Sequence, residues 1–336
     1  MNGKGTNGCR RFPGLGLALG LFVVPTAFGQ SLGGAEVPTS SAETNRPLRV
    51  AFSGSMFADL NENDAGAAVR VWAQMLGRDH GIPVDPVVKI LQGTNAIAEA
   101  VLQRTIDVIT LTTEEYWNLR TKIALGSFVF GVKGGRQTEE YLLLVHRESG
   151  IEKLADLRGR SLNCFRSPAT GLATAWLENL LGLRNQPPLA AYFERVTEFT
   201  KLSRVMLPVF FRQADGCVVS RQGFETACEL NPQLGKQLKT IAVSPQVVST
   251  VFCFRDDYKA PYREQLLARL KDLNQSPAGR QFLTLFQCDS MREGPASMMA
   301  ETVELLSTHE QLLRGTNLVI ASRSNLKPTI KPGEQN

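Results

Sequence analysis

Hydrophobic and polar positions switch between a period of two and a period near 3.6 along the chain from residue 48 onward. Leu48, Val50 and Phe52 alternate with their neighbours, which predicts a β-strand. Helix and strand patterns then follow in turn over residues 62–81 (helix), 84–91 (strand), 94–105 (helix) and 106–112 (strand). Strands that alternate with helices predict a parallel sheet with helices on its faces.

The middle of the chain repeats this alternation, and the end of the chain is mostly helical. Further strands are predicted over residues 140–149, 160–165, 214–220, 238–244 and 248–257. Helices are predicted over residues 170–182, 202–213 and 221–230, and over most of 258–314. Two successive α/β units fit a tandem arrangement, and they equally fit two lobes joined by crossover strands. The periodicity leaves both arrangements open.

The first 29 residues have the three regions of a secretory signal peptide. A basic start that includes Arg10 and Arg11 is followed by an apolar run over residues 15–24 and by small residues before Gln30. We therefore expect export and cleavage before Gln30. The general secretory route and the twin-arginine route both stay open.

Composition and charge indicate an ordinary globular protein and exclude two classes of protein. The chain has 336 residues, of which 43% are hydrophobic and 21% are charged, and this is enough for two domains. Its 37 basic and 32 acidic residues give a net charge of +5, and removal of residues 1–29 takes away three basic residues, which leaves +2. No basic run indicates binding of nucleic acid, and no apolar run of about 18 residues indicates a membrane span. Contact with a membrane is expected only through a partner.

Cysteine and histidine positions argue against a metal centre and against an enzyme. Five cysteines follow the signal segment, and their spacings match no metal-binding motif. Cys164, Cys217 and Cys253 lie in strand-like apolar runs and are expected to be small core residues, although a disulfide stays open. The three histidines are scattered, and the sequence has no nucleophile elbow or nucleotide-binding loop. We expect no catalytic residue, no metal site and no cofactor.

Three stretches resemble one family of solute-binding proteins. Residues 150–182 (GIEKLADLRGRSLNCFRSPATGLATAWLENLLG) resemble the opening of the second lobe in periplasmic solute-binding proteins of the phosphate/phosphite/phosphonate type. Residues 105–119 (TIDVITLTTEEYWNL) are similar to the end of the family's first half-lobe, and residues 212–230 (RQADGCVVSRQGFETACEL) to a later strand and helix. The order and spacing of the three stretches fit the family from about Leu48 to Asp256.

This resemblance implies the type 2 periplasmic-binding fold. Two α/β lobes, each a mixed or parallel sheet flanked by helices, would be joined by two crossover strands, and the strands near Tyr141 and Phe252 would lie close to the crossings. The expected parts are a signal peptide (1–29), a flexible linker (30–46), a first lobe (47–137 plus 250–325), a second lobe (138–249) and a disordered tail (326–336).

The resemblance also implies a function without catalysis. The family captures a small anion between its lobes and delivers it to an ABC permease. We therefore expect a monomeric periplasmic protein that binds a small oxyanion or an anionic organic ligand by hinge closure. An extracytoplasmic sensor of the same fold, which presents its ligand to a membrane receptor or kinase, is the alternative.

Candidate ligand contacts in the first lobe follow from the topology. Loops at the carboxyl ends of parallel strands form the usual binding crevice of such sheets. Thr112 and Glu115 have the spacing of a capping box, which would leave Thr113 free for a ligand. Thr94 could instead cap its own helix. The candidate contacts are Ser53, Ser55, Thr94, Thr112, Thr113 and Tyr116.

Candidate contacts in the second lobe centre on the turn before the helix predicted at residue 170. A helix N-terminus leaves backbone N–H groups unpaired and carries partial positive charge, which suits an anion. Thr170 could also be a simple helix cap, and Asp215 a turn residue at a strand start. Pro168 and Ala169 stand where the family's turn has hydroxyl residues, which argues against phosphonate itself. The candidate contacts are Tyr141, Ser167, Thr170, Gly171 and Asp215, and the family uses the last position to contact a ligand amine or to orient donors.

Overall fold

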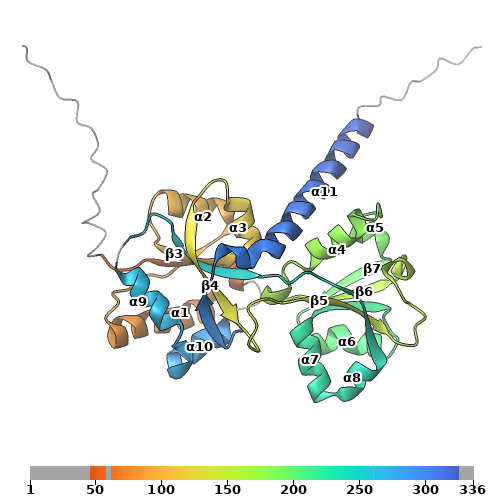
Figure 1. Ribbon diagram of the computed structural model, residues 1–336, viewed down its shortest axis with the longest axis horizontal. Helices are drawn as coiled ribbons and strands as arrows, with labels where there is room; N and C mark the ends of the chain where they lie inside the picture. The colour runs from red at the N-terminus through yellow and green to blue at the C-terminus, as the bar shows by residue number, and fades with distance from the viewer. Residues whose placement is uncertain (1–45, 58–61, 260, 325–336) are drawn as a thin grey trace, which may run out of the picture. The chain divides into compact units, whose positions relative to one another are not determined.

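The computed structural model describes residues 46–57, 62–259 and 261–324 (Figure 1). The expected signal peptide (1–29), nearly all of the expected linker (30–46) and the expected tail (326–336) lie outside the described residues. Among the described helices, none combines the length and the hydropathy that a membrane span requires.

The first sheet is mixed rather than wholly parallel. β1 pairs in parallel with β2 and with β3, as the alternation of strands and helices predicts. β10 comes from much later in the chain and runs antiparallel to β3 and β4, with Phe252 opposite Thr110. The spatial order of the six strands is β11 (Ser290–Glu293), β4 (Leu125–Val132), β10 (Thr250–Arg255), β3 (Val108–Thr112), β1 (Val50–Ser53) and β2 (Lys89–Leu91).

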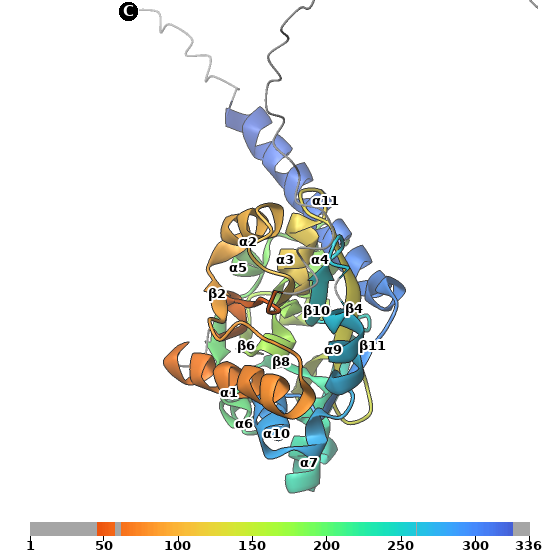
Figure 2. The same ribbon diagram turned by 90° about the vertical axis from the view of Figure 1, so that its left-hand side faces the viewer.

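Helices cover both faces of the first sheet because its strands carry apolar side chains on both faces. Val50 and Phe52 of β1 pack in one core cluster with α1, α9 and α10, whereas Ala51 packs on the opposite face with α2 and α3. Figure 2 shows α1 and α2 on opposite sides of β2. These helices are α1 (Glu62–His80), α2 (Gly93–Leu102), α3 (Thr113–Leu119), α9 (Tyr262–Leu270) and α10 (Pro277–Leu285).

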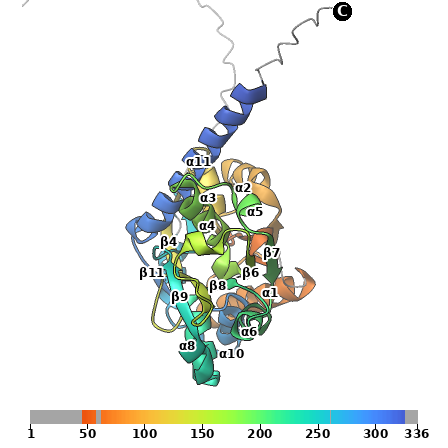
Figure 3. The ribbon, with the colours of Figure 1, turned by 90° about the vertical axis from the view of Figure 1, so that its right-hand side faces the viewer.

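The second sheet is also mixed and is also covered on both faces. Its five strands lie in the order β7 (Arg195–Phe199), β6 (Ser161–Phe165), β8 (Gly216–Ser220), β5 (Tyr141–His146) and β9 (Leu238–Val243). β6 is parallel to β7 and β8, and β5 is antiparallel to β8 and β9. One face packs against α4 (Ala173–Gly182) and α5 (Leu189–Tyr192), and the other against α6 (Leu202–Phe210), α7 (Arg221–Leu230) and α8 (Pro232–Gln237) (Figure 3).

Two helix starts differ from the sequence predictions. α2 begins at Gly93 after Gln92, so Thr94 lies inside the first turn, and the expectation that Thr94 caps this helix is wrong. α4 begins at Ala173, because Pro168–Thr170 form a separate 3₁₀ turn. The predicted helix N-terminus at Thr170 and Gly171 is therefore wrong as well.

The C-terminal helix α11 (Ala300–Ser324) packs against the second sheet's layer of helices. Leu305 and Leu306 belong to the core cluster on the α4 face of that sheet, and the Asn179 side-chain amide donates to the Leu305 carbonyl at 2.8 Å. From the expected first-lobe range 250–325, β10 and β11 lie in the first sheet and α9 and α10 pack on it, whereas Leu305 and Leu306 of α11 pack on the second sheet. The lobe boundaries at 137 and 249 stay predictions.

Two connections join the sheets, and they run side by side. Glu139 in the first connection and Val247 in the second exchange both backbone hydrogen bonds, each 2.8 Å long. The Gln246 N–H donates to the Glu301 carboxylate at 2.6 Å, and the Val248 N–H donates to the Thr302 hydroxyl at 2.8 Å. The start of α11 therefore holds the second connection in place.

A buried ion cluster joins the amino-terminal ends of β1 and β3 to the carboxyl-terminal end of β10. The Asp107 side chain is 1% exposed, and it accepts from Arg49 Nε at 3.0 Å and from Arg49 Nη2 at 2.7 Å. Arg255, which is 3% exposed, and Arg46 contact the same carboxylate at 3.4 and 3.3 Å. A bidentate arginine–carboxylate pair of this kind fixes the relative orientation of the two side chains and also contributes to stability.

We expect Asp107→Asn to lower the free energy of unfolding by about 3 kcal/mol, because it removes the charge of the buried carboxylate on which Arg49 and Arg255 converge, although Arg255 keeps its contact with Asp257. Urea unfolding followed by circular dichroism measures this change. Glu148→Gln is the matched control, since Glu148 pairs with Arg212 on the surface, and it should change stability by less than about 1 kcal/mol. Equal losses in the two variants would contradict a structural role for the cluster.

Candidate functional site

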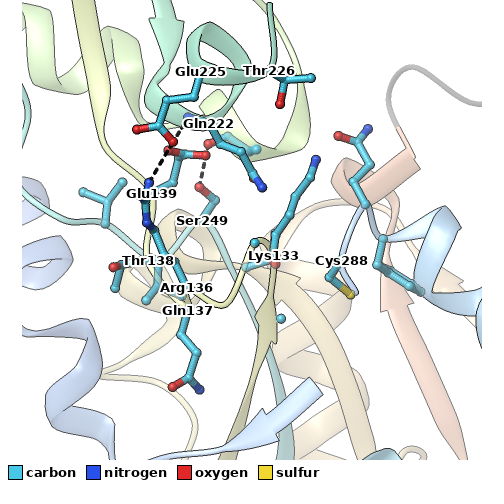
Figure 4. A pocket seen from close by; sticks show the side chains of 18 of the residues that line it. Lys133, Arg136, Gln137, Thr138, Glu139, Gln222, Glu225, Thr226, Ser249 and Cys288 are labelled. Carbon is cyan, nitrogen blue, oxygen red and sulfur yellow. Dashed lines mark hydrogen bonds and ion pairs between the residues drawn. The ribbon is translucent and has the colours of Figure 1, made fainter. Parts of the chain in front are cut away.

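A pocket of about 420 Å³ lies between the two sheets, beside the two connections. It receives residues from the first connection, from α7, from the segment that leads into β10 and from the loop that follows α10 (Figure 4). Its polar and charged lining residues include Lys133, Arg136, Gln137, Thr138, Glu139, Gln222, Glu225, Thr226, Glu229, Ser249 and Thr250. Met56, Val247, Leu285 and Phe286 supply apolar surface.

Lys133 is the cation of this pocket that is available to a ligand. Arg136 Nη1 already contacts Glu225 Oε2 at 3.2 Å. Within the described part of the chain, the Lys133 ammonium group has no hydrogen bond or ion pair, and the side chain is exposed. Figure 4 shows Lys133 extending from the end of β4 toward Gln222. An anionic ligand in the pocket would therefore find its counter-charge on Lys133.

The Gly134 backbone allows the close approach of the Gln222 side chain. Gly134 has a φ of +54°, and a Cβ atom built there would lie 2.8 Å from Gln222 Nε2. Since a positive φ and this contact both disfavour a side chain, glycine suits the position. The close approach brings α7 against the first connection.

Glu139 lies in the first connection, where it is half-buried beside the start of α7. Its Oε1 atom accepts from the Glu140 N–H at 3.0 Å and from the Gln222 N–H at 3.4 Å. Burial raises the pKa of the Glu139 carboxyl, although these two hydrogen bonds and the charges of Lys133 and Arg136 act in the opposite direction. The net shift is upward, so ionised Glu139 is less favourable in the folded protein than in water.

Ser53, Ser55 and Thr112 do lie together, as predicted, but they surround a carboxylate of the chain itself. Ser53 Oγ and Ser55 Oγ donate to Glu115 Oε1 at 2.5 and 2.8 Å. The Thr112 N–H and hydroxyl donate to Glu115 Oε2 at 3.0 and 3.1 Å, which confirms the predicted capping box. None of these residues lines the pocket, although Met56, which follows Ser55, does.

The remaining first-lobe candidates are packed rather than open to the pocket. The Thr113 hydroxyl donates to the Val248 carbonyl at 2.6 Å and the residue is 1% exposed, so the expectation that Thr113 is free for a ligand is wrong. Tyr116 packs edge-on against Phe128, with 5.4 Å between ring centroids, and burial raises its pKa. Thr94 is partly exposed and does not line the pocket.

The second-lobe candidates form a closed turn beside the pocket. Thr170 Oγ1 donates to the Phe165 carbonyl at 2.7 Å and accepts from the Ser167 N–H at 3.0 Å, and Gly171 is exposed. Their neighbour Ala169 lines the pocket. Its carbonyl accepts from Tyr141 Oη at 3.1 Å and from Ser249 Oγ at 2.8 Å. The turn therefore contributes a hydrogen-bonded carbonyl to this region.

Asp215 lies at the opposite end of β8 from the pocket. β8 has five residues, so the strand separates Asp215 from the pocket-lining start of α7 by about 16 Å. Burial raises the pKa of Asp215, but hydrogen bonds from the Ser161 N–H and hydroxyl and from Arg160 outweigh it, and the net pKa is lowered. Asp215 therefore links the starts of β6 and β8 through its hydrogen bonds with Ser161. This agrees with the alternative interpretation, in which Asp215 is a turn residue at a strand start.

The sequence pattern points only weakly to the pocket residues that it does not predict. Lys133 and Arg136 lie in a polar segment, KGGRQTEE, between a strand that was not predicted and β5. Gln222 follows the carboxyl end of β8, where the same topological rule that selected Ser53 and Thr112 also applies.

The cysteines predicted to be core residues are buried in the structure. Cys164, Cys217 and Cys253 are buried core residues, as predicted, and all five cysteines in this part of the chain are free thiols. Burial raises the pKa of the Cys164 thiol to about 12. Within the described ranges, no cluster of three or more potential metal ligands is present.

Comparison with known proteins identifies the family. A sequence profile described as "ABC transporter, phosphonate, periplasmic substrate-binding protein" matches residues 55–298. The chain belongs to this family. Members of the family are substrate-binding components of ABC transporters, which is a periplasmic role without catalysis, and they work with a small ligand and a permease. A comparison with curated protein sequences gives no match.

Solved structures show the same fold at low sequence identity. XAC2383 from Xanthomonas citri, solved bound to ATP, has a TM-score of 0.53 and 16% identity over 80% of this chain and 98% of its own. PhnD1 from Prochlorococcus marinus (MIT 9301), solved in complex with methylphosphonate, has a TM-score of 0.50 and 12% identity over 80% of this chain and 98% of its own. This phosphonate-binding family member therefore has the two-lobe periplasmic-binding fold.

We expect Glu139→Gln to be more stable than the wild type at neutral pH. Folding raises the pKa of Glu139. The favourable contribution of Glu139 to the free energy of unfolding is therefore present below the ordinary pKa of 4.5 and is lost as the pH rises through the raised pKa. Gln keeps the acceptor oxygen and removes the charge. Urea midpoints across this pH range measure the difference, which should shrink as the pH falls toward 4.5.

Glu229→Gln, which removes an exposed charge from the same pocket, is the control for Glu139→Gln. Its free energy of unfolding should stay within about 0.5 kcal/mol of the wild-type value throughout the pH range. A Glu139→Gln difference that does not depend on pH would contradict the assignment.

Proposed function

We propose that this phosphonate-binding family member captures a small oxyanion or an anionic organic ligand in the pocket between its sheets and delivers it to an ABC permease. The observation that carries this proposal is the Lys133 ammonium group in the pocket, which has no partner among the residues that the structure describes. The solved relatives with bound methylphosphonate and ATP, both anionic, support the choice of ligand class.

The arrangement of the pocket suits an anion with polar substituents. Lys133 supplies the charge, and Gln137, Thr138, Gln222 and Thr226 supply neutral donors and acceptors around it. Ser167 and Gly171 stay proposed contacts from the turn beside Ala169, since both retain some exposure. Ser53, Ser55, Thr112, Thr113 and Thr170 are supporting residues in this proposal because their hydroxyls donate within the protein.

Hinge closure would accompany binding in the proposed mechanism. The pocket lies against both connections between the sheets, and its lining comes from both lobes. A ligand that bridges Lys133 and the start of α7 would favour the closed arrangement, since it can only shift a conformational equilibrium through contacts that differ between the two states. We also propose that the protein is exported to the periplasm and acts there as a monomer.

We expect Lys133→Ala to weaken binding of the anionic ligand by about tenfold or more, because a hydrogen bond to a charged group is worth about 1.5–3 kcal/mol. A thermal-shift screen of phosphate, phosphite, methylphosphonate, sulfonates and carboxylates selects the ligand. Isothermal titration calorimetry with the selected ligand then compares the variant with the wild type.

Lys122→Ala is the matched control, because it removes the same charge from an exposed lysine that does not line this pocket. Its affinity should equal that of the wild type. Equal affinity of Lys133→Ala and the wild type would reject this pocket as the site, and the absence of stabilisation by every anion would reject the ligand class.

A further inference from the structure

We propose that Trp117, Arg120 and Glu310 form a latch that opposes closure of the two lobes and so sets how tightly the protein binds its ligand. The inference rests on the proposed function, because it assumes that the lobes close over the pocket. None of the three residues lines the pocket. The latch therefore acts through the equilibrium between open and closed arrangements of the lobes, and not through contact with the ligand.

Buried contacts fix α11 to α4 of the second lobe. Leu305 and Leu306 are each 4% exposed, in the core cluster that they share with α4. The Asn179 side-chain amide of α4 donates to the Leu305 carbonyl at 2.8 Å. Further along α11, Leu312 packs on Gly182, where a Cβ atom would lie 2.7 Å from Leu312 Cδ1. We therefore expect this part of α11 to move with the second lobe.

The latch joins α11 to α3 of the first lobe. Glu310 Oε2 accepts from Trp117 Nε1 at 3.1 Å and from Arg120 Nη2 at 3.0 Å. The Arg120 guanidinium lies over the Trp117 ring, 3.4 Å from its centroid, which is a cation–π contact. Leu119 anchors α3 in the first lobe, since it is 1% exposed in a core cluster of the first sheet. The contacts of the latch therefore cross from one lobe to the other.

The latch and the pocket lie on opposite sides of the two connections. Figures 1 and 2 both show α3, α4 and α11 above α7 and α10. The pocket takes its lining from α7 and from the loop that follows α10, and the latch lies between α3 and α11. A hinge motion about the connections that narrows the pocket therefore separates α3 from α11. Closure of the lobes breaks the latch.

The start of α11 lies at the hinge, and Glu310 lies well away from it. The Thr302 hydroxyl accepts from the Val248 N–H at 2.8 Å, and Val303 packs against the core cluster of the first sheet that contains Leu119. Glu310 follows Thr302 by eight residues (310 minus 302), which is about 12 Å along the helix. Because a rotation displaces an atom in proportion to its distance from the axis, the contacts of Glu310 are lost before that of Thr302.

The latch is weak enough to break reversibly. The side chains of Arg120 and Glu310 are each 33% exposed, and partly exposed ion pairs contribute little to stability. A contact that is present only in the open arrangement lowers the closed fraction, and the apparent affinity falls in proportion to that fraction. Loss of the latch should therefore tighten ligand binding.

The first arm of the test measures the arrangement of the lobes in the full chain without ligand. Nitroxide labels on Gln281→Cys in α10 and Leu230→Cys at the end of α7, both exposed positions, report the distance between the lobes by pulsed electron paramagnetic resonance. Cys228 and Cys288, which are partly exposed, are replaced by serine in every protein. The population at the shorter distance should rise by about threefold in Glu310→Ala.

Arg314→Ala is the matched control, because Arg314 also pairs with Glu310 but lies on α11 itself, so this pair does not join the lobes. Its distance distribution should equal that of the wild type. An unchanged distribution in Glu310→Ala, or a shift toward longer distances, would overturn the latch. If Glu310→Ala does not fold, Trp117→Phe decides by the same outcomes, since it keeps an aromatic ring and removes the hydrogen-bond donor.

The second arm measures affinity for methylphosphonate by isothermal titration calorimetry. Glu310→Ala should bind about threefold more tightly than the wild type, and Arg314→Ala should bind equally well. Addition of Arg120→Ala to Glu310→Ala should give no further gain, since both changes remove one contact. Equal or weaker binding by Glu310→Ala would overturn the role of the latch in affinity.

The two arms separate failure of the latch from failure of the proposed function. The distance measurement needs no ligand, so it decides whether the latch opposes closure even where no anion binds. Absence of binding by the wild type and by every variant, together with the expected change of distance, would count against the proposed function alone.

Discussion

The connection between the two sheets depends on a buried backbone whose polar groups must be satisfied inside the protein. Val247 is fully buried and Val248 is 3% exposed, so water cannot pair with their N–H and C=O groups. Glu139 pairs with Val247, the Thr302 hydroxyl accepts from Val248, and the Thr113 hydroxyl donates to it. These partners come from three separate parts of the chain, so the connection forms only when the first sheet, α11 and the other connection pack together.

This constraint also decides which groups face the pocket. The Thr113 hydroxyl and the Ala169 carbonyl are used to hold the connection and the adjacent turn, and Glu115 uses the hydroxyls at the ends of β1 and β3. In the proposed function, Lys133 and Gln222 meet the ligand. Recognition would then come from the segment after β4 and from the start of α7.

Local patterns predicted the elements that are both regular and deeply buried. β1, β3, β5 and β8 match their predicted ranges closely, because burial and period coincide in them. β4, β7 and β11 were missed: β4 contains two glycines and a serine, β7 is partly exposed, and β11 has four residues. Periodicity likewise could not predict the pairing of β10 with β3 and β4, since the paired residues lie 123 (252 minus 129) to 146 (254 minus 108) positions apart and carry no local record of their register.

The amino-acid pattern alone predicts the family, the alternation of strands and helices, and contacts between residues a few positions apart, such as the capping box of Thr112 and Glu115. The packed structure is needed to show that Ser53 joins the same carboxylate and that three arginines share Asp107. It also decided that Lys133 and Gln222 border one pocket. The reason is that local geometry fixes contacts within a turn, whereas contacts across tens of residues exist only after the sheets have packed.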